Sequence, residues 1–273
     1  MTGHEKTLAA PSSAQAYFFK KHALMVAGVL VFVVLGGLCS YAVGFSPVTA
    51  LQEFPNGLYW MSVHFMPGED APKALGKILS ALFMSIMDSL AAAATAAVCA
   101  YICALIGSRT VGFGGIAQFI VRGIASIARN IPTVAWAFVL LACFKQNEFT
   151  GYLALFMKSF GFLTRTFLET IDEVPNGPIE ALRASGASWF SIMTHAVIPL
   201  SMTQIISWLL YMFETNVRDA TLVGMLTGTG IGFVFQMYYR SYRYGLSGLV
   251  IVCVAIMVIV CEVSSNYVRR RVK

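Results

Sequence analysis

The chain has 273 residues, of which 58% are hydrophobic and 12% charged, and its formal net charge is +6. A soluble domain carries about twice that share of charged residues, so this composition excludes an ordinary soluble protein. Apolar runs of roughly 20 residues predict membrane-spanning helices, and no long period-two alternation indicates a transmembrane barrel. We therefore predict an all-α membrane protein. The positive charge does not indicate a nucleic-acid partner, because the basic residues gather at the ends of apolar runs.

About six spans are expected in chain order, at 23–43, 78–106, 131–144, 149–168, 200–223 and 246–263. The first is interpreted as a retained helix. The alternative is a cleaved signal peptide, but the run is long for a signal core and no small-residue cleavage site is convincing. The third run is short, and an amphipathic helix over 116–128 is expected to extend it, with a bend at Pro132. The polar face of that helix carries Gln118, Arg122, Ser126 and Arg129.

The distribution of Lys and Arg predicts the orientation of these spans. With a cytoplasmic N-terminus, twelve of the 19 basic residues lie inside, five lie outside, and Lys158 and Arg218 fall within spans. The twelve are Lys6, Lys20, Lys21, Arg109, Arg122, Arg129, Arg165, Arg183, Arg269, Arg270, Arg271 and Lys273. Both termini are therefore expected in the cytoplasm. The expected organisation is a cytoplasmic segment 1–22, a first span 23–43, an outer loop 44–77, a helical core 78–266 and a basic cytoplasmic tail 267–273.

A short polar segment lies on the cytoplasmic side between the fourth and fifth spans: "IEALRASGASWFSIMTHAVIP", residues 179–199. A helix is expected to follow the breaker cluster 175–178 and to stop at Gly186, which accepts a left-handed conformation. Ser188 is expected to cap a second helix, which Pro199 closes before the fifth span. Such a bent pair suits a socket on another protein. The alternative is an amphipathic loop that packs on its own bundle.

Glu180-Ala181-Leu182, Gly186 and Pro199 resemble the EAA loop of binding-protein-dependent ABC importer permeases, whose consensus reads E-A-A, three residues, G, nine residues, I-x-L-P. Residues 129–140, 169–188 and 209–232 are similar to the phosphonate-type permease subfamily, although Thr227 and Thr229 replace family glycines. The resemblance covers roughly residues 79–272. It implies the type I (MetI-like) permease fold in a bacterial inner membrane, with a coupling-helix region at 170–199. The residues it implicates in ATPase coupling are Glu180, Ala181, Arg183, Gly186, Ala187 and Pro199.

The partners implied by the resemblance are a second permease chain (identical or a paralogue), two cytoplasmic ABC ATPase subunits and a periplasmic substrate-binding protein. The chain has no G-x-x-x-x-G-K-[ST] motif, so ATP and Mg are expected on the ATPase and no cofactor is expected here. Cys99 and Cys103 are interpreted as packing residues, because their spacing is not that of a zinc site. No metal site is expected.

Charged residues inside spans are candidates for the translocation pathway or gate. Glu214 and Arg218 lie four residues apart in the outer half of the fifth span, which suits a helical ion pair. This pair either neutralises itself or, with Asn216, forms part of an anion path. Lys158 and Asp88 complete the candidate set of Lys158, Glu214, Asn216, Arg218 and Asp88.

We therefore predict the transmembrane permease subunit of an ATP-driven ABC importer for phosphonate or a related phosphorus oxyanion. The alternatives are an ABC importer permease for another small solute and a secondary transporter driven by an ion gradient. A membrane-embedded enzyme is disfavoured, because the four histidines are scattered and form no acid–base or metal cluster.

Overall fold

The computed structural model describes residues 13–112 and 114–272, which divide into two units between Val63 and His64. Lys6, Lys273 and most of the predicted segment 1–22 lie outside the described residues. The first unit contains helix α1 (Ser13–Val43) and most of helix α2 (Pro47–His64). Helix α1 is apolar around its circumference, as a lipid-facing span requires.

The prediction of an outer loop over 44–77 was wrong for most of its length, because α2 occupies 47–64 and helix α3 already begins at Ala71. Pro47 and Pro72 lie in the first turns of these helices. There the missing N–H has no intrahelical partner to lose. Pro47 and Pro72 therefore mark helix starts.

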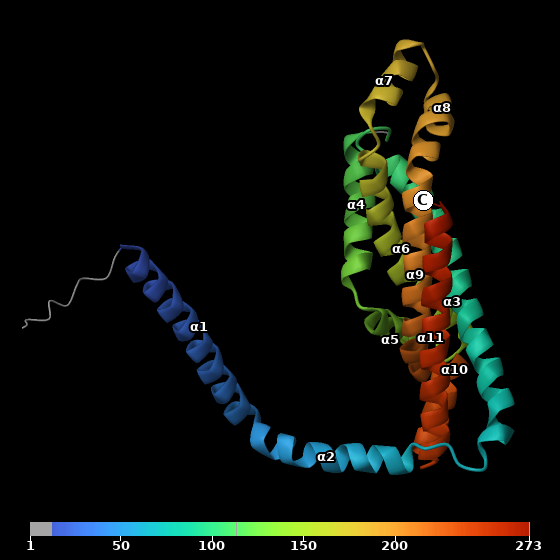
Figure 1. Ribbon diagram of the computed structural model, residues 1–273. Helices are drawn as coiled ribbons and strands as arrows, with labels where there is room; N and C mark the ends of the chain where they lie inside the picture. The colour runs from blue at the N-terminus through green and yellow to red at the C-terminus, as the bar shows by residue number, and fades with distance from the viewer. Residues whose placement is uncertain (1–12, 113, 273) are drawn as a thin grey trace, which may run out of the picture. The chain divides into compact units, whose positions relative to one another are not determined.

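The second unit is a bundle whose long helices run side by side, with α7 and α8 projecting beyond one end (Figure 1). We refer to residues 176–197 as the elbow, to the end of the bundle that carries it as the elbow end, and to the opposite end as the far end. The helices of this unit are α3 (Ala71–Gly107), α4 (Gly115–Asn130), α5 (Thr133–Phe144), α6 (Glu148–Asp172), α7 (Asn176–Ala184), α8 (Trp189–Ile192), the π-helical turn η1 (Met193–Val197), α9 (Ile198–Thr227), α10 (Gly230–Arg240) and α11 (Tyr244–Val272). The described residues contain no strand.

Four helical segments among the described residues are long and apolar enough to cross a membrane: Tyr17–Val43, Ala71–Gly107, Trp189–Thr227 and Tyr244–Arg271. The pair α4 and α5, which is bent by 96°, raises the number to five if it forms one broken span. Helix α6 contains the remaining predicted span, 149–168, and its 25 residues extend roughly 37 Å. Its length suffices for the ~30 Å hydrocarbon core, but Lys158, Arg165 and Glu169 make it more polar than the others.

The core of the bundle depends on close helix packing by small residues. Ala92, Ala96, Ala100 and Ala104 recur every four residues along α3 and are fully buried, and α3 packs more extensively on α6 than on any other helix. Small side chains let two backbones approach closely, which is the usual source of helix association in lipid. Larger buried residues, among them Phe167 and Ile171 of α6, fill the space near the elbow end.

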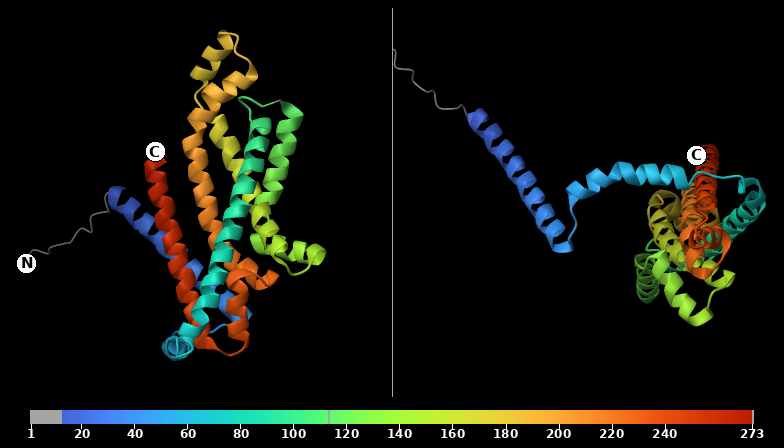
Figure 2. Two further views of the ribbon diagram at one scale, coloured as in Figure 1. Left: turned by 90° about the vertical axis from the view of Figure 1, so that its right-hand side faces the viewer. Right: turned by 90° about the horizontal axis from the view of Figure 1, so that it is seen from below.

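Two further connections differ from the sequence-based expectation. Helix α4 extends the short third run, as expected. The bend of 96° at its C-terminal end directs α5 sideways, away from the axis of α4 (Figure 2). The connection after the fifth span contains helix α10, which folds back on α9 so tightly that a Cβ on Gly232 would lie 2.0 Å from the Thr221 carbonyl oxygen. Tyr238 on α10 is consequently buried in the core.

Candidate functional site

The elbow is formed by a helix that stops at a glycine. Gly186 has φ +79°, and its N–H donates to the Arg183 carbonyl oxygen (3.0 Å), while the N–H of Ala187 donates to that of Leu182 (3.0 Å). These two hydrogen bonds define a Schellman termination of α7. The Ser188 hydroxyl then accepts from the N–H of Ser191 and caps α8. The predicted glycine stop and serine cap are both confirmed.

The prediction that Pro199 closes the second elbow helix was wrong. Helix α8 continues through the π turn η1 into α9, so one helical segment runs from Trp189 to Thr227. The N–H of Ile198 donates five residues back to the Met193 carbonyl oxygen. Pro199 lies in the first turn of α9, and the widened turn accommodates the missing donor and the ring. A force on α8 therefore acts directly on α9.

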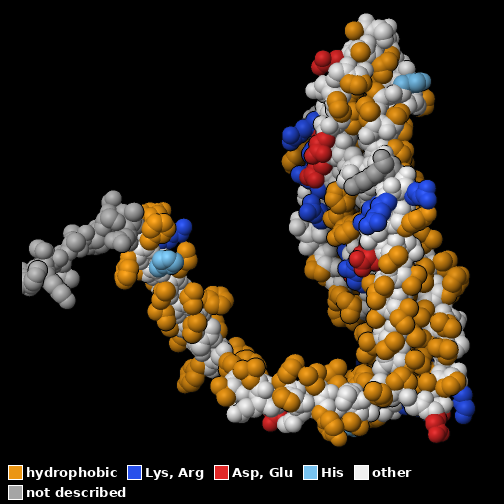
Figure 3. Space-filling model, in the orientation of Figure 1, with side chains coloured by type: hydrophobic (Ala, Val, Ile, Leu, Met, Phe, Trp, Pro, Cys, Tyr) orange, Lys and Arg blue, Asp and Glu red, His pale blue; other side chains and the backbone are white. Residues whose placement is uncertain are grey.

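The elbow presents most of the predicted coupling residues to solvent. Glu180, Ala181, Arg183, Gly186 and Pro199 are exposed, and Ala187 is partly buried. Ile179 of α7 is buried at 2% exposure and anchors the helix in the core. The elbow extends beyond the apolar surface that covers the lower part of the bundle on the face shown in Figure 3. Its exposed face is therefore free to receive a partner.

The elbow is attached to the loop between α3 and α4. The Arg183 guanidinium donates to the Thr110 carbonyl oxygen (2.9 Å), and the Trp189 indole N–H donates to that of Val111 (2.7 Å). We call these two hydrogen bonds the elbow clamp. They connect both elbow helices to the loop that joins α3 and α4.

A carboxylate that the sequence analysis missed organises the base of the same loop. Asp172, the last residue of α6, accepts from the Ser108 hydroxyl and the Arg109 N–H, each at 2.7 Å. Its second oxygen pairs with Arg122 of α4 at 2.7 Å. The loop is therefore held between α4 and α6. The sequence signal was an acid just after a predicted span, together with a cation on the polar face of a predicted amphipathic helix.

The predicted ion pair between Glu214 and Arg218 is present on α9. Glu214 is also 3.4 Å from Arg269 of α11, which the sequence placed in a cytoplasmic tail. Helix α11 continues to Val272 and thereby brings Arg269 alongside Glu214. This cluster joins α9 to the last turns of α11.

Two other pathway candidates lie in helix interfaces. Asn216 is fully buried, and its amide donates to the Ser159 hydroxyl of α6 at 2.8 Å. Asp88 is partly buried beside Ser85 and the closely packed Gly230, and within the described residues it forms no ion pair with Lys158 or Arg218. Both residues therefore face neighbouring helices of this chain.

Lys158 belongs to a different cluster, which surrounds the break between α4 and α5. Its ammonium group lies 2.5 Å from the Asp219 carboxylate of α9, and the Thr133 hydroxyl donates to the same oxygen at 2.7 Å. These groups border a cavity of about 300 Å³, which we call the break cavity. Its lining residues are Arg129, Ile131, Pro132, Thr133, Val134, Lys158, Asp219, Leu222 and Val223.

Arg129 and Asp219 are the members of this cluster that sequence reasoning missed. Arg129 was counted with the cytoplasmic cations, but α4 packs along α6 and carries it to the level of Lys158. Asp219 was overlooked although it lies inside a predicted span next to Arg218, where an acid requires a partner. No group of three or more His, Cys, Asp and Glu residues gathers at a potential metal site within the part of the chain that the structure describes.

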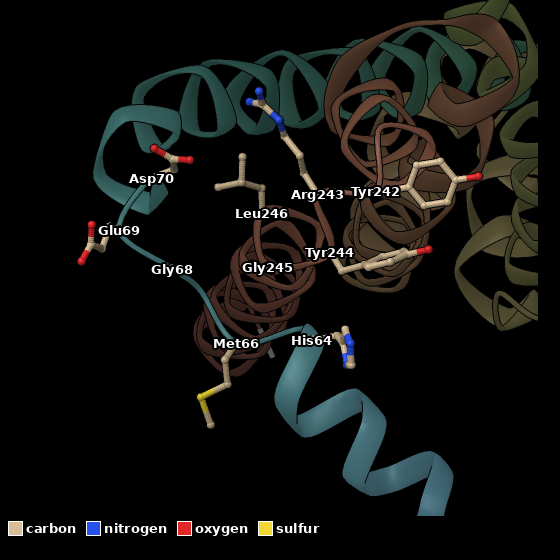
Figure 4. Close-up of a pocket in the computed structure, with 10 residues that line it drawn as sticks. All are labelled: His64, Met66, Gly68, Glu69, Asp70, Tyr242, Arg243, Tyr244, Gly245 and Leu246. Atoms are coloured by element: carbon tan, nitrogen blue, oxygen red, sulfur yellow. The ribbon is translucent and has the colours of Figure 1, made fainter.

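A second cavity, of about 480 Å³, lies at the far end of the bundle (Figure 4). The segment from Met66 to Asp70 passes beside the first turn of α11, with Glu69 and Asp70 on one side and Tyr242 and Tyr244 on the other. Its lining residues are His64, Met66, Gly68, Glu69, Asp70, Tyr242, Arg243, Tyr244, Gly245 and Leu246. The cavity brings together parts of the two connections that the sequence placed outside the membrane.

A bundle of long apolar helices with a protruding elbow and a charged cavity is typical of a membrane transport subunit. The family described as "Binding-protein-dependent transport system inner membrane component" matches residues 96–273, and the chain belongs to this family. It is an ABC importer permease of the phosphonate-type subfamily, as the sequence motifs implied.

Several relatives carry names from phosphorus transport. The phosphite transport system permease protein PtxC of Stutzerimonas stutzeri is 26% identical over 89% of this chain and 88% of its own length. The phosphate-import permease protein PhnE of Mycolicibacterium smegmatis is 29% identical over 53% of this chain, which spans only 27% of that relative. The cryptic phosphonate transport system permease protein PhnE2 of Escherichia coli is 33% identical over 43% of this chain and 97% of its own length.

Solved structures share the fold at lower identity. An inward-facing MetNI methionine ABC transporter aligns with a TM-score of 0.60 and 19% identity over 72% of this chain and 98% of that chain. An amino acid ABC transporter aligns with a TM-score of 0.62 and 18% identity over 73% of this chain and 95% of that chain. The predicted type I permease fold is confirmed.

Proposed function

We propose that this chain is the permease subunit of an ATP-driven importer that carries a phosphorus oxyanion, such as phosphite, phosphate or a phosphonate, across a bacterial inner membrane. The observation that carries the ATP-driven part is the exposed elbow. Its glycine-terminated helix α7 projects from the bundle, α8 continues through η1 into α9, and both elbow helices are hydrogen-bonded to the α3–α4 loop. A separate ATPase that binds ATP and Mg is the partner that fits this elbow.

The names of the relatives support the phosphorus oxyanion, since phosphate, phosphite and phosphonate permeases all match this chain. The chemistry of the break cavity agrees, because Arg129 and Lys158 border it against a single carboxylate, Asp219. A guanidinium binds tetrahedral oxyanions through a two-point geometry.

The complete importer would contain two permease chains, two ATPase subunits and a periplasmic binding protein. On this proposal the elbow end is cytoplasmic, both termini of the chain are cytoplasmic, and the far end faces the periplasm. The cavity in Figure 4 then offers the binding protein a polar docking surface with acidic, basic and aromatic side chains. ATP binding would move the elbows, and α9 would transmit that movement to the pathway.

The test is uptake into proteoliposomes that contain the permease and its ATPase, with ATP inside and the cognate binding protein outside. We expect ATP-dependent uptake of phosphite, phosphate or methylphosphonate, and none of methionine or glutamine. Uptake without the ATPase, sustained by a proton or sodium gradient, would instead identify a secondary transporter. ATP-dependent uptake of a solute without phosphorus would retain the importer and refute the substrate.

A further inference from the structure

We infer that the break cavity is an oxyanion-binding site within the permease itself, in which Arg129, Lys158 and the first turn of α5 bind the anion during transport. This inference deepens the proposed function and takes the class of anion from it. The observations that carry it are the broken helix, the available guanidinium and the exchangeable ion pair.

The first observation is the position of the break. Helices α4 and α5 meet at 96°, and the residues at their junction, Ile131, Pro132 and Thr133, line the cavity. Pro132 provides no side-chain cap for α5, so the first-turn N–H groups of α5 are left to bind another acceptor. The N-terminus of a helix favours negative charge, and non-helical backbone within a membrane protein is tolerated where it borders a cavity.

The second observation is an arginine with spare hydrogen-bonding capacity. Arg129 lines the cavity and forms no ion pair within the described residues; its guanidinium carbon lies 5.9 Å from the centre of the Phe162 ring. Stacking on a ring orients a guanidinium while its N–H groups stay available. The guanidinium of Arg218 is less available to an anion, because it already forms an ion pair with Glu214.

The orientation of Arg129 is set by the contact between α4 and α6. Gly161 of α6 faces the end of α4 so closely that a Cβ there would lie 2.5 Å from the Arg129 backbone nitrogen. The absence of a side chain at 161 therefore fixes the distance between Arg129 and Lys158, which lies one turn earlier on α6.

The third observation is the ion pair of Lys158 with Asp219. Both side chains are about one-fifth exposed, at 22% and 23%, so the pair borders the cavity and is not sealed in the core. Thr133 donates to the same Asp219 oxygen. An entering oxyanion would accept from the Lys158 ammonium, while Thr133 continues to satisfy Asp219.

Charge and size agree with a small anion. Arg129 and Lys158 oppose the single Asp219, so the cavity carries a net positive charge in the absence of cargo. Its volume of about 300 Å³ lies at the small end of the ~300–1,000 Å³ range of small-molecule sites. A phosphorus oxyanion with four or five heavy atoms fits such a space.

The experiment measures binding of radiolabelled inorganic phosphate to the detergent-purified permease–ATPase complex without the binding protein. We expect saturable binding to the wild type and at least a tenfold weaker affinity for Arg129→Gln, since charge-assisted hydrogen bonds are lost. Arg129→Lys, which keeps the charge, should recover part of that loss. Arg165→Gln is the matched control, because Arg165 pairs with Glu169 on α6 and does not line the cavity, and its affinity should stay within about twofold of wild type.

The double variant Lys158→Met with Asp219→Asn tests whether this ion pair binds the anion or only stabilises the fold. Removing both charges leaves neither one unpaired, so a merely structural pair would tolerate the change. We expect the double variant to assemble with its ATPase and to lose phosphate affinity at least tenfold. Wild-type affinity in the double variant or in Arg129→Gln, or no saturable binding to the wild type at millimolar phosphate, would overturn the site.

Uptake distinguishes failure of the site from failure of the proposed function. In proteoliposomes Arg129→Gln should lower the maximal rate of phosphite uptake at least tenfold and leave the half-saturating concentration unchanged, because the binding protein sets the latter. A wild type that binds phosphate here but imports no phosphorus oxyanion would refute the proposed function alone. Normal phosphite uptake by Arg129→Gln would refute the site alone.

Discussion

The contact between α4 and α6 at Gly161 gives the sharpest prediction about how the break cavity is built. In Gly161→Ala the new methyl would lie 2.5 Å from the Arg129 nitrogen and 2.7 Å from the carbonyl carbon and Cβ of Ala128. Ordinary contact begins near 3.4 Å, so α4 must retreat by about 0.9 Å. The obstacle is backbone, which cannot rotate away as a flexible side chain can.

The expected energy follows from two opposing effects. Overpacking of this kind destabilises by about 1–3 kcal/mol, while replacing a helical glycine by alanine stabilises by about 1 kcal/mol. We therefore expect Gly161→Ala to be destabilised by up to ~2 kcal/mol. Gly123→Ala on α4 is the matched control, because nothing lies within 4 Å of its Cβ. It should gain up to about 1 kcal/mol from helix propensity alone.

The assays are thermal unfolding of the purified permease–ATPase complex and uptake into proteoliposomes. The two alanine variants should differ by about 1–3 kcal/mol, which shifts the unfolding midpoint by several degrees in a chain of this size. Uptake by Gly161→Ala should fall at least tenfold, because an error near 1 Å at a binding site costs about that much or more. Equal stability of the two variants together with full uptake by Gly161→Ala would refute the packing argument.

Three further predictions concern the elbow and the ion cluster. Gly186→Val should uncouple ATP hydrolysis from uptake, because a β-branched residue at φ +79° costs at least about 1–2 kcal/mol. Gly186→Asn is the control, since asparagine tolerates that conformation, and it should keep most of the coupling. If the two variants took up the same amount of substrate per ATP hydrolysed, a backbone effect would be refuted. Trp189→Phe removes the donor to Val111 but keeps an aromatic ring, so the elbow clamp loses roughly 1 kcal/mol. Uptake per ATP hydrolysed should therefore decrease. An unchanged uptake per ATP would show that the clamp transmits no movement. Glu214→Gln leaves Arg218 and Arg269 without their carboxylate and should destabilise the bundle by about 2 kcal/mol, which is less than for a fully buried pair because Arg218 is half exposed. Glu262→Gln, at an exposed position of α11, is the control. Equal midpoints of thermal unfolding for the Glu214 and Glu262 variants would contradict this prediction.

The sequence was sufficient for the features that depend on local spacing. Apolar runs predicted the helices that form the bundle, since lipid requires the backbone of each span to satisfy its own hydrogen bonds. Gly186 and Ser188 predicted the elbow, because a left-handed stop and a serine cap involve only neighbouring residues. The four-residue spacing of Glu214 and Arg218 likewise predicted their ion pair.

The expectation that Pro199 ends a helix was wrong for a local reason. Pro199 was expected to close the second elbow helix, yet it lies in the first turn of α9, into which α8 continues through η1. A proline restricts only its own turn, and a π turn before Pro199 is enough to keep α8 and α9 as one segment.

The break cavity was decided by tertiary structure alone. Arg129, Lys158 and Asp219 come from three helices that are far apart in sequence, and their proximity depends on how closely α4 approaches α6 at Gly161. Periodicity identifies which face of a helix is polar, but it does not specify which helix meets that face or at what depth. The sequence by itself therefore determined the spans, the elbow and the family motif, while packing between helices determined which charges share a cavity.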